Sequence, residues 1–148
     1  MKAWTMRALV TVAVAGLISV VAGADNNNGL GQRSQCDEGT LRGSYVLTAR
    51  GFTIVGGVAQ PKAIVELIDF HGDGALTVTG GTLSFNGSVT QIPPNGAGNY
   101  TLGPDCNGTL NFIPVPNFSL FVERDGKSGW VIQTNNNNVF QGTLTQRK

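Results

Sequence analysis

Residues 63–87 read A-I-V-E-L-I-D-F-H-G-D-G-A-L-T-V-T-G-G-T-L-S-F-N-G, and this stretch decides the fold class. Two apolar segments, Ala63–Phe70 and Ala75–Phe85, are separated only by the short run His71–Gly74. Apolar runs of this length, bounded by glycine and aspartate, are typical of β-strands. Because the connection is so short, the sequence predicts two neighbouring strands joined by a tight turn.

Two further signals lie in the second half of this stretch. Asn86-Gly87 follows the second strand, and this dipeptide is the strongest short-range indication of a β-hairpin. Gly80-Gly81 interrupts the alternation within the strand, and a glycine pair inside a strand predicts a bulge or a corner.

The same pattern continues on both sides. Leu41–Arg50 alternates with a period of two, whereas no segment of ten or more residues after Ala24 has helical spacing. Short strands are also predicted at 98–102, 108–113, 118–124, 129–134 and 139–146. This many short strands with frequent turns indicates an all-β barrel or sandwich. Short connections favour a meander, and closure removes exposed edges, so we predict a single antiparallel meander β-barrel of about eight strands.

The first residues have the organisation of a secretory signal peptide. Lys2 and Arg7 precede the apolar run Ala8–Val21, and small residues at Ala22 and Ala24 permit cleavage after Ala24. That run is too short to span a hydrocarbon core of roughly 30 Å, and no later stretch is apolar enough to do so. We therefore expect a secreted or periplasmic protein without a membrane span in its mature form. The expected divisions are a signal peptide at 1–24, a flexible leader at 25–37 and a barrel domain at 38–148.

Charge is scarce in this chain. Charged residues make up 13% of the 148 positions and the formal net charge is +1, whereas average proteins contain about 25% charged residues. This composition excludes a basic nucleic-acid footprint and a charged disordered chain. The sequence also lacks the G-x-S-x-G motif of nucleophilic catalysis and a glycine-rich phosphate loop followed by a helix. We therefore expect no cofactor and no nucleic-acid partner.

The two cysteines, Cys36 and Cys106, both follow the expected signal peptide. In an oxidising compartment an even pair is typical of a disulfide, which would close a loop of about 70 residues. A catalytic thiol and a metal pair are the alternatives. Neither cysteine has a C-x-x-C partner, and the only histidine, His71, is distant in sequence. The disulfide is therefore the favoured interpretation.

Four short strings occur in an order that resembles a known group. They are C-D-E-G-T-L-R-G-S-Y at 36–45, D-F-H-G-D-G at 69–74, Y-T-L-G-P-D-C-N-G-T-L at 100–110 and W-V-I-Q-T at 130–134. This order resembles a group of small exported bacterial proteins whose fold is similar to the allene oxide cyclase-like barrel, a relative of the lipocalin-type calycins. The resemblance covers about residues 36–146. It implies a closed barrel with a lumen, and it does not by itself imply cyclisation.

Glu66 is the candidate acid. In an alternating strand it shares a face with Ile64, Ile68 and Phe70. Inside a barrel its carboxyl group would have a raised pKa and would serve as a general acid or base, with Tyr45 as a positioning donor. The alternative, which we favour at this stage, is that this apolar face packs elsewhere and Glu66 is solvated at its edge.

Aromatic residues are the candidates for ligand contact. Five of them would line a lumen for an apolar ligand: Tyr45, Phe118, Phe121, Trp130 and Phe140. The same side chains would equally fill a small eight-stranded barrel outright, and this filling is the favoured interpretation.

The run 69–74 also has the beginning of a calcium-loop pattern, with Asp69, His71 and Asp73 at alternate positions. Histidine is a poor calcium ligand, and Gly80 stands where a bidentate glutamate is needed. A simple turn, with Gly72 and Gly74 at positive φ, is therefore preferred, and no metal is expected.

Three functions follow from these observations. The first is an exported, non-catalytic barrel that binds a small apolar ligand or acts as an envelope module. The second is an isomerase or cyclase of the allene oxide cyclase-like kind, which uses Glu66 and Tyr45 in an apolar lumen. The third is a protein–protein or adhesion module with a filled barrel.

Overall fold

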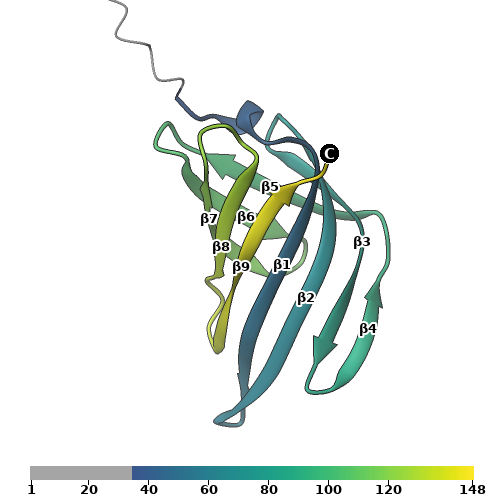
Figure 1. Cartoon of the computed structure of the whole chain (residues 1–148). Helices are drawn as coiled ribbons and strands as arrows, with labels where there is room; N and C mark the ends of the chain where they lie inside the picture. Colours follow the sequence, from purple (N-terminus) through teal and green to yellow (C-terminus); the bar gives the residue numbers. More distant parts are fainter. Residues whose placement is uncertain (1–34) are drawn as a thin grey trace, which may run out of the picture. The chain divides into compact units, whose positions relative to one another are not determined.

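The computed structural model describes residues 35–148, so the expected signal peptide and most of the leader lie outside the described residues. The described chain contains nine strands and one short helix (Figure 1). Their bounds are η1 Glu38–Thr40, β1 Arg42–Val55, β2 Val58–His71, β3 Ala75–Phe85, β4 Ser88–Ile92, β5 Gly96–Leu102, β6 Asn107–Phe112, β7 Asn117–Val122, β8 Ser128–Gln133 and β9 Asn138–Gln146. Within this part of the chain no helix is long and apolar enough to cross a membrane.

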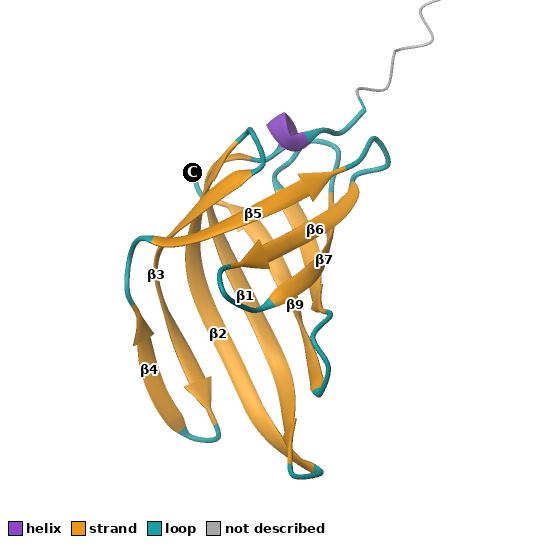
Figure 2. Cartoon of the chain, turned by 180° about the vertical axis from the view of Figure 1, so that it is seen from behind, coloured by secondary structure: helices purple, strands orange, loops and turns teal. Residues whose placement is uncertain are grey.

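The strands form a closed antiparallel barrel. Neighbours follow the order β2-β1-β9-β8-β7-β6-β5-β3-β4, and an additional β2–β3 pairing closes the ring. Eight strands make up the ring, while β4 lies outside it beside the second half of β3 (Figure 2). The predicted all-β meander barrel of about eight strands is therefore confirmed.

The bulge predicted at Gly80-Gly81 explains why β4 lies outside the ring. The β2–β3 register shifts between Leu67 and Ile68, which pair with Gly80 and Val78 respectively. Before the bulge β3 pairs with β5, and after it β3 pairs with β4. A side chain at Gly81 would place its Cβ 2.6 Å from the carbonyl oxygen of Val65, so only glycine permits this close approach.

The β1–β2 hairpin is longer than the sequence predicts. The two strands pair without interruption from Arg42 and His71 to Val55 and Val58, and the turn uses Gly56-Gly57 at positive φ. Pro61 is tolerated in β2 because its carbonyl group points away from β1 and accepts a hydrogen bond from the Asn86 amide (2.8 Å). Its missing N–H therefore removes no bond from the β1–β2 ladder.

One end of the barrel, which we call the plugged end, is filled by aromatic side chains. Tyr45, Phe70 and Tyr100 pack edge to face, with centroid distances of 5.1 and 4.9 Å. The Tyr100 hydroxyl donates to the carbonyl oxygens of Glu38 (2.7 Å) and Leu41 (3.0 Å), which fixes η1 across this end. These contacts account for the burial of both tyrosines.

A disulfide reinforces the plugged end. Cys36 and Cys106 are bonded, with a Cα–Cα distance of 5.0 Å, and both residues are buried. The bond ties the segment before η1 to the β5–β6 connection. The predicted pairing is confirmed.

The connections alternate between the two ends, as a meander requires. The connections β2–β3, β5–β6 and β7–β8 lie at the plugged end. We call the other end the open end. It carries the β1–β2 and β3–β4 hairpins and the β6–β7 and β8–β9 connections, at 56–57, 86–87, 113–116 and 134–137.

Candidate functional site

The half of the barrel toward the open end contains a cavity of about 460 Å³. Its wall includes buried side chains of six different strands: Leu47, Glu66, Val78, Phe112, Phe118 and Phe140. Exposed residues of the β6–β7 connection, Ile113 and Val115, line its mouth. The barrel is therefore packed at the plugged end and hollow toward the open end, so it is not the filled barrel that we favoured from sequence.

Glu66 lies at the inner end of this cavity. Glu66 pairs with Leu47 of β1. The next inward-facing pair toward the plugged end, two residues along each strand, is Tyr45 and Ile68. With 6% of its surface exposed, Glu66 is the one buried polar or charged side chain among residues 35–148. The favoured expectation of a solvated Glu66 was wrong, because closure of the barrel turns the face of β2 that carries it toward the interior.

Burial changes the acidity of Glu66. Desolvation raises the pKa of its carboxyl group from 4.5 to about 7. None of the hydrogen bonds or ion pairs that the described residues form involves this carboxyl group, and desolvation is the one cause of the shift. Near neutral pH the cavity therefore holds a mixture of the acid and the carboxylate, available to a ligand.

Lys62 is the second ionisable residue of the cavity, and the sequence analysis missed it. It lies on the same inward face of β2 as Glu66, and its Nζ is 4.3 Å from the centroid of the Phe140 ring. The ammonium group also donates to Oε1 of Gln133 (3.4 Å), and burial lowers its pKa. The period of two along β2 could have identified it, because Lys62, Ile64 and Glu66 are alternate residues on one face of the strand.

The five aromatic candidates separate into three groups. Phe118 and Phe140 line the cavity, with ring centroids 6.4 Å apart. Tyr45 belongs to the plugged end, where its hydroxyl donates to the carbonyl oxygen of Gly126 (2.8 Å), and it does not line the cavity. Phe121 and Trp130 are 43% and 51% exposed on the outer wall.

The placement of Phe121 and Trp130 in the lumen is therefore corrected. Strand β7 buries Phe118, Leu120 and Val122, so the alternate residue Phe121 must point outward. In β8 the inward residue is Val131, which leaves Trp130 outside.

The position of Tyr45 supports a prediction about stability. Tyr45→Phe should lower the free energy of unfolding by about 1–2 kcal/mol, because the buried Gly126 carbonyl group loses its donor. Urea denaturation measures this change. The affinity for a cavity ligand should remain that of the wild type, and a large loss of affinity would instead place the phenol in the binding site.

The three metal candidates have separate partners. Asp69 accepts a hydrogen bond from Ser44, His71 Nε2 is 3.2 Å from the Thr77 hydroxyl, and Asp73 accepts from the Ala75 amide (3.0 Å). Gly72 and Gly74 have positive φ angles, as predicted for a turn. Among residues 35–148 no group of three or more histidine, cysteine or acidic side chains is arranged to hold a metal ion.

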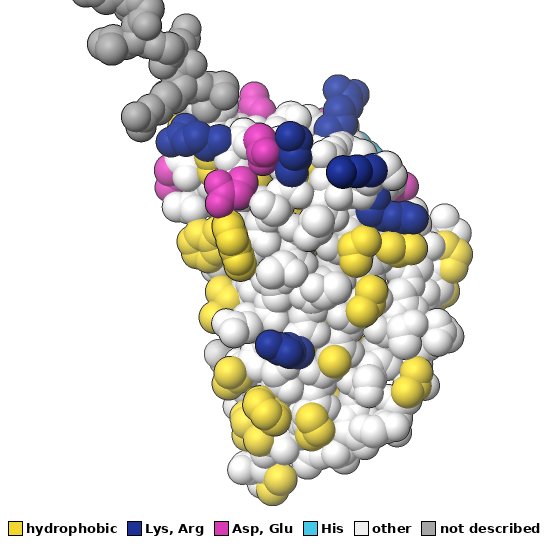
Figure 3. All heavy atoms as spheres, in the orientation of Figure 1, with side chains coloured by type: hydrophobic (Ala, Val, Ile, Leu, Met, Phe, Trp, Pro, Cys, Tyr) yellow, Lys and Arg dark blue, Asp and Glu magenta, His cyan; other side chains and the backbone are white. Residues whose placement is uncertain are grey.

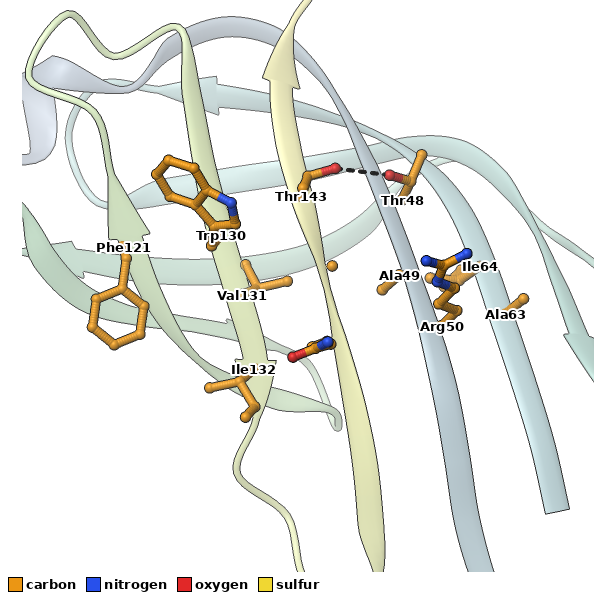
Figure 4. A pocket seen from close by; sticks show the side chains of 12 residues that line it. Thr48, Ala49, Arg50, Ala63, Ile64, Phe121, Trp130, Val131, Ile132 and Thr143 are labelled. Atoms are coloured by element: carbon orange, nitrogen blue, oxygen red, sulfur yellow. Dashed lines mark hydrogen bonds between the residues drawn. The ribbon is translucent and has the colours of Figure 1, made fainter. Parts of the chain in front are cut away.

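A second hollow, of about 630 Å³, lies on the outer wall (Figure 4). Phe121, Trp130, Thr143 and Thr48 lie in register across β7, β8, β9 and β1, and the two threonine hydroxyls are hydrogen-bonded at 3.0 Å. Of its lining residues, Ala49 and Val131 are buried, whereas Phe121, Trp130 and Ile132 are exposed, and no buried ionisable group lines it. The inner cavity is the better candidate site. Of the two hollows, it is the one whose apolar walls contain a buried carboxyl group without a hydrogen-bond partner, that of Glu66.

Comparisons with protein-family models, with curated proteins and with solved structures found no match for this chain. The geometry of the cavity is therefore the basis for assigning a function.

Proposed function

We propose that this protein binds a small apolar ligand in the cavity of its barrel. The observation that carries the proposal is the cavity itself: about 460 Å³ of space, with Leu47, Val78 and Phe140 on its walls and Glu66 at its inner end. Ligand pockets are mostly apolar and contain a few polar groups that fix the orientation of the ligand. A volume of this size suits a small organic molecule and is too small for a folded partner.

The charges in the cavity indicate the polarity of the ligand. Glu66 gains a partner from a hydroxyl, amide or carbonyl group, because the carboxyl group donates when protonated and accepts when ionised. Lys62 is already held by Gln133 and the Phe140 ring toward the mouth. The ligand that fits best is therefore an uncharged molecule with an apolar body and one hydrogen-bonding group at its inner end.

The proposal includes export to the periplasm or beyond the cell. The signal-peptide pattern of residues 1–24 supports it. The Cys36–Cys106 disulfide agrees with an oxidising compartment.

Two measurements test ligand binding. Native mass spectrometry of the protein purified from its own source should reveal a co-purifying small molecule. Fluorescence titration with the neutral apolar probe N-phenyl-1-naphthylamine should show saturable binding to protein from which that molecule has been removed. Val78→Phe should weaken this binding by roughly tenfold or more, because the phenyl ring occupies cavity volume.

Trp130→Ala is the matched control, since Trp130 lines the outer hollow and not the cavity. It should leave the probe affinity unchanged, and thermal denaturation should show that Val78→Phe is folded. Loss of binding in Trp130→Ala with full binding in Val78→Phe would move the site to the outer wall and overturn the proposal.

A second candidate function is an isomerase or cyclase, which the allene oxide cyclase-like resemblance implies. One observation favours it: a carboxyl group with a pKa of about 7 in an apolar cavity is suited to general acid–base catalysis at neutral pH. Tyr45 is engaged with Gly126, which leaves the acid without its expected positioning donor. If the co-purifying molecule is converted by the protein, Glu66→Gln should abolish turnover while the ligand still binds.

A further inference from the structure

Charged residues are distributed unequally along the barrel axis. The runs 74–104, 106–122 and 128–146 contain no aspartate, glutamate, lysine or arginine, and neither does 51–61. These runs supply all four connections of the open end. The connections of the plugged end, in contrast, carry Asp73, Asp105 and the charged run 123–127. Figure 3 shows the result on one face: acidic and basic side chains gather at the upper end, one basic side chain lies farther down, and none lies at the lower tip.

The open end is also where apolar side chains are most exposed. Six large aliphatic residues are at least 54% exposed, more than any other large apolar side chain that the structure describes. They are Val55, Val58, Val89, Ile113, Val115 and Val139. Each lies in or beside one of the four connections of this end. Single exposed apolar residues are common on protein surfaces, but their gathering at one end of the molecule marks an interaction site.

We call these six side chains the apolar rim of the open end, and part of this rim adjoins the mouth of the cavity. Ile113 and Val115 line the cavity directly, and the β1–β2 hairpin extends the same strands that carry Leu47 and Glu66. An apolar molecule that enters or leaves the cavity at this mouth therefore passes Ile113 and Val115.

We propose that the open end docks on the surface of a lipid bilayer. Four separate loops present one or two aliphatic side chains each at the open end, which suits shallow insertion into a fluid apolar layer. A protein interface typically has aromatic anchors in a contiguous, well-packed patch with a polar rim. Asn135–Asn137 and Gln60, which are polar and uncharged, lie near this end and would contact the lipid headgroups. The charged plugged end would remain in water. Docking goes beyond ligand binding and does not depend on it, because the rim exists whether or not the cavity is occupied.

Co-sedimentation with large lipid vesicles tests this proposal. The chain should bind vesicles of phosphatidylcholine alone as well as vesicles that also contain phosphatidylglycerol, at low and at high sodium chloride, because the four connections of the open end carry no charged residue. The double variant Val58→Asp, Val115→Asp should reduce binding roughly tenfold, since two carboxylates would have to enter the interface.

Val65→Asp is the matched control. Val65 is 50% exposed, but it lies in mid-strand on the outer wall of β2, between Thr48 and Thr82. It should bind vesicles as the wild type does, and because all variants share residues 1–34, their comparison removes any contribution of that segment.

Four results would overturn the proposal. They are equal binding by the double variant and the wild type, no binding to any vesicle, binding that requires phosphatidylglycerol and disappears in salt, and a dimer in analytical ultracentrifugation that the double variant dissociates. The last result would make a second copy of the chain the occupant of the rim. Probe binding in the cavity is measured separately, so failure of docking and failure of ligand binding are distinguishable.

Discussion

Replacement of Cys36 and Cys106 with alanine is expected to lower the free energy of unfolding by about 4 kcal/mol, the largest change that we predict. The bond joins residues separated by 70 positions in sequence, and it therefore restricts most of the unfolded barrel. In the chain-entropy model, loss of a loop of this length costs about 4 kcal/mol, a large part of the stability of a typical small domain. Urea denaturation of the oxidised wild type and of the double variant measures the difference.

Alanine is chosen because both sulfur atoms are in a buried environment, where serine would add an unpaired hydroxyl group. Wild type treated with a reducing agent should lose about the same stability as the double variant. A loss below about 1 kcal/mol in both samples would show that the contacts of Tyr100 with Glu38 and Leu41 hold the plugged end without the bond.

Glu66→Gln is expected to stabilise the protein, and only above acidic pH. The pKa of Glu66 is about 7 in the folded state and 4.5 without the effect of burial. Below the lower value the carboxyl group is neutral in both states and has no effect. Between the two values the unfolded chain loses its proton while the folded chain keeps it, so wild-type stability falls as pH rises. Above pH 7 the full effect, about 3 kcal/mol, is present.

The variant should therefore match the wild type near about pH 4 and exceed it by up to about 3 kcal/mol near about pH 8. Chemical denaturation at both pH values measures this. The exposed residue Glu123 supplies the control, since Glu123→Gln should not show such a difference. A constant offset between Glu66→Gln and wild type at every pH would mean that the carboxyl group has an ordinary pKa, and that water reaches it freely.

Local patterns in the sequence account for much of this architecture. The turn at Gly72 and Gly74, the bulge at Gly80-Gly81 and the Asn86-Gly87 hairpin all occur where the sequence places them. Each depends on a backbone conformation that glycine or asparagine adopts readily, so nearby residues are sufficient to predict it. The alternation of β2 likewise places Glu66 on one face with Ile64 and Ile68.

The candidate site was predicted only in part, because alternation leaves the inward face undecided when both faces are apolar. In β7 and β8, Phe121, Trp130 and Ile132 are as hydrophobic as the alternate residues that are buried, Leu120 and Val131. The hydrophobicity of the residues therefore cannot show which face of these two strands points into the barrel. No local pattern in the sequence places Lys62 beside Phe140, because the two residues are 78 positions apart.

The sequence by itself therefore determined the class of fold, the turns at 71–74 and 86–87, the bulge and the pairing of the two cysteines. These features depend on residue type and on local spacing. Closure of the barrel decided the rest, because a side chain is inside or outside only relative to strands that are distant in sequence. Closure buried Glu66, left Trp130 in solvent, kept a cavity of about 460 Å³ and brought the uncharged connections of the chain together at one end.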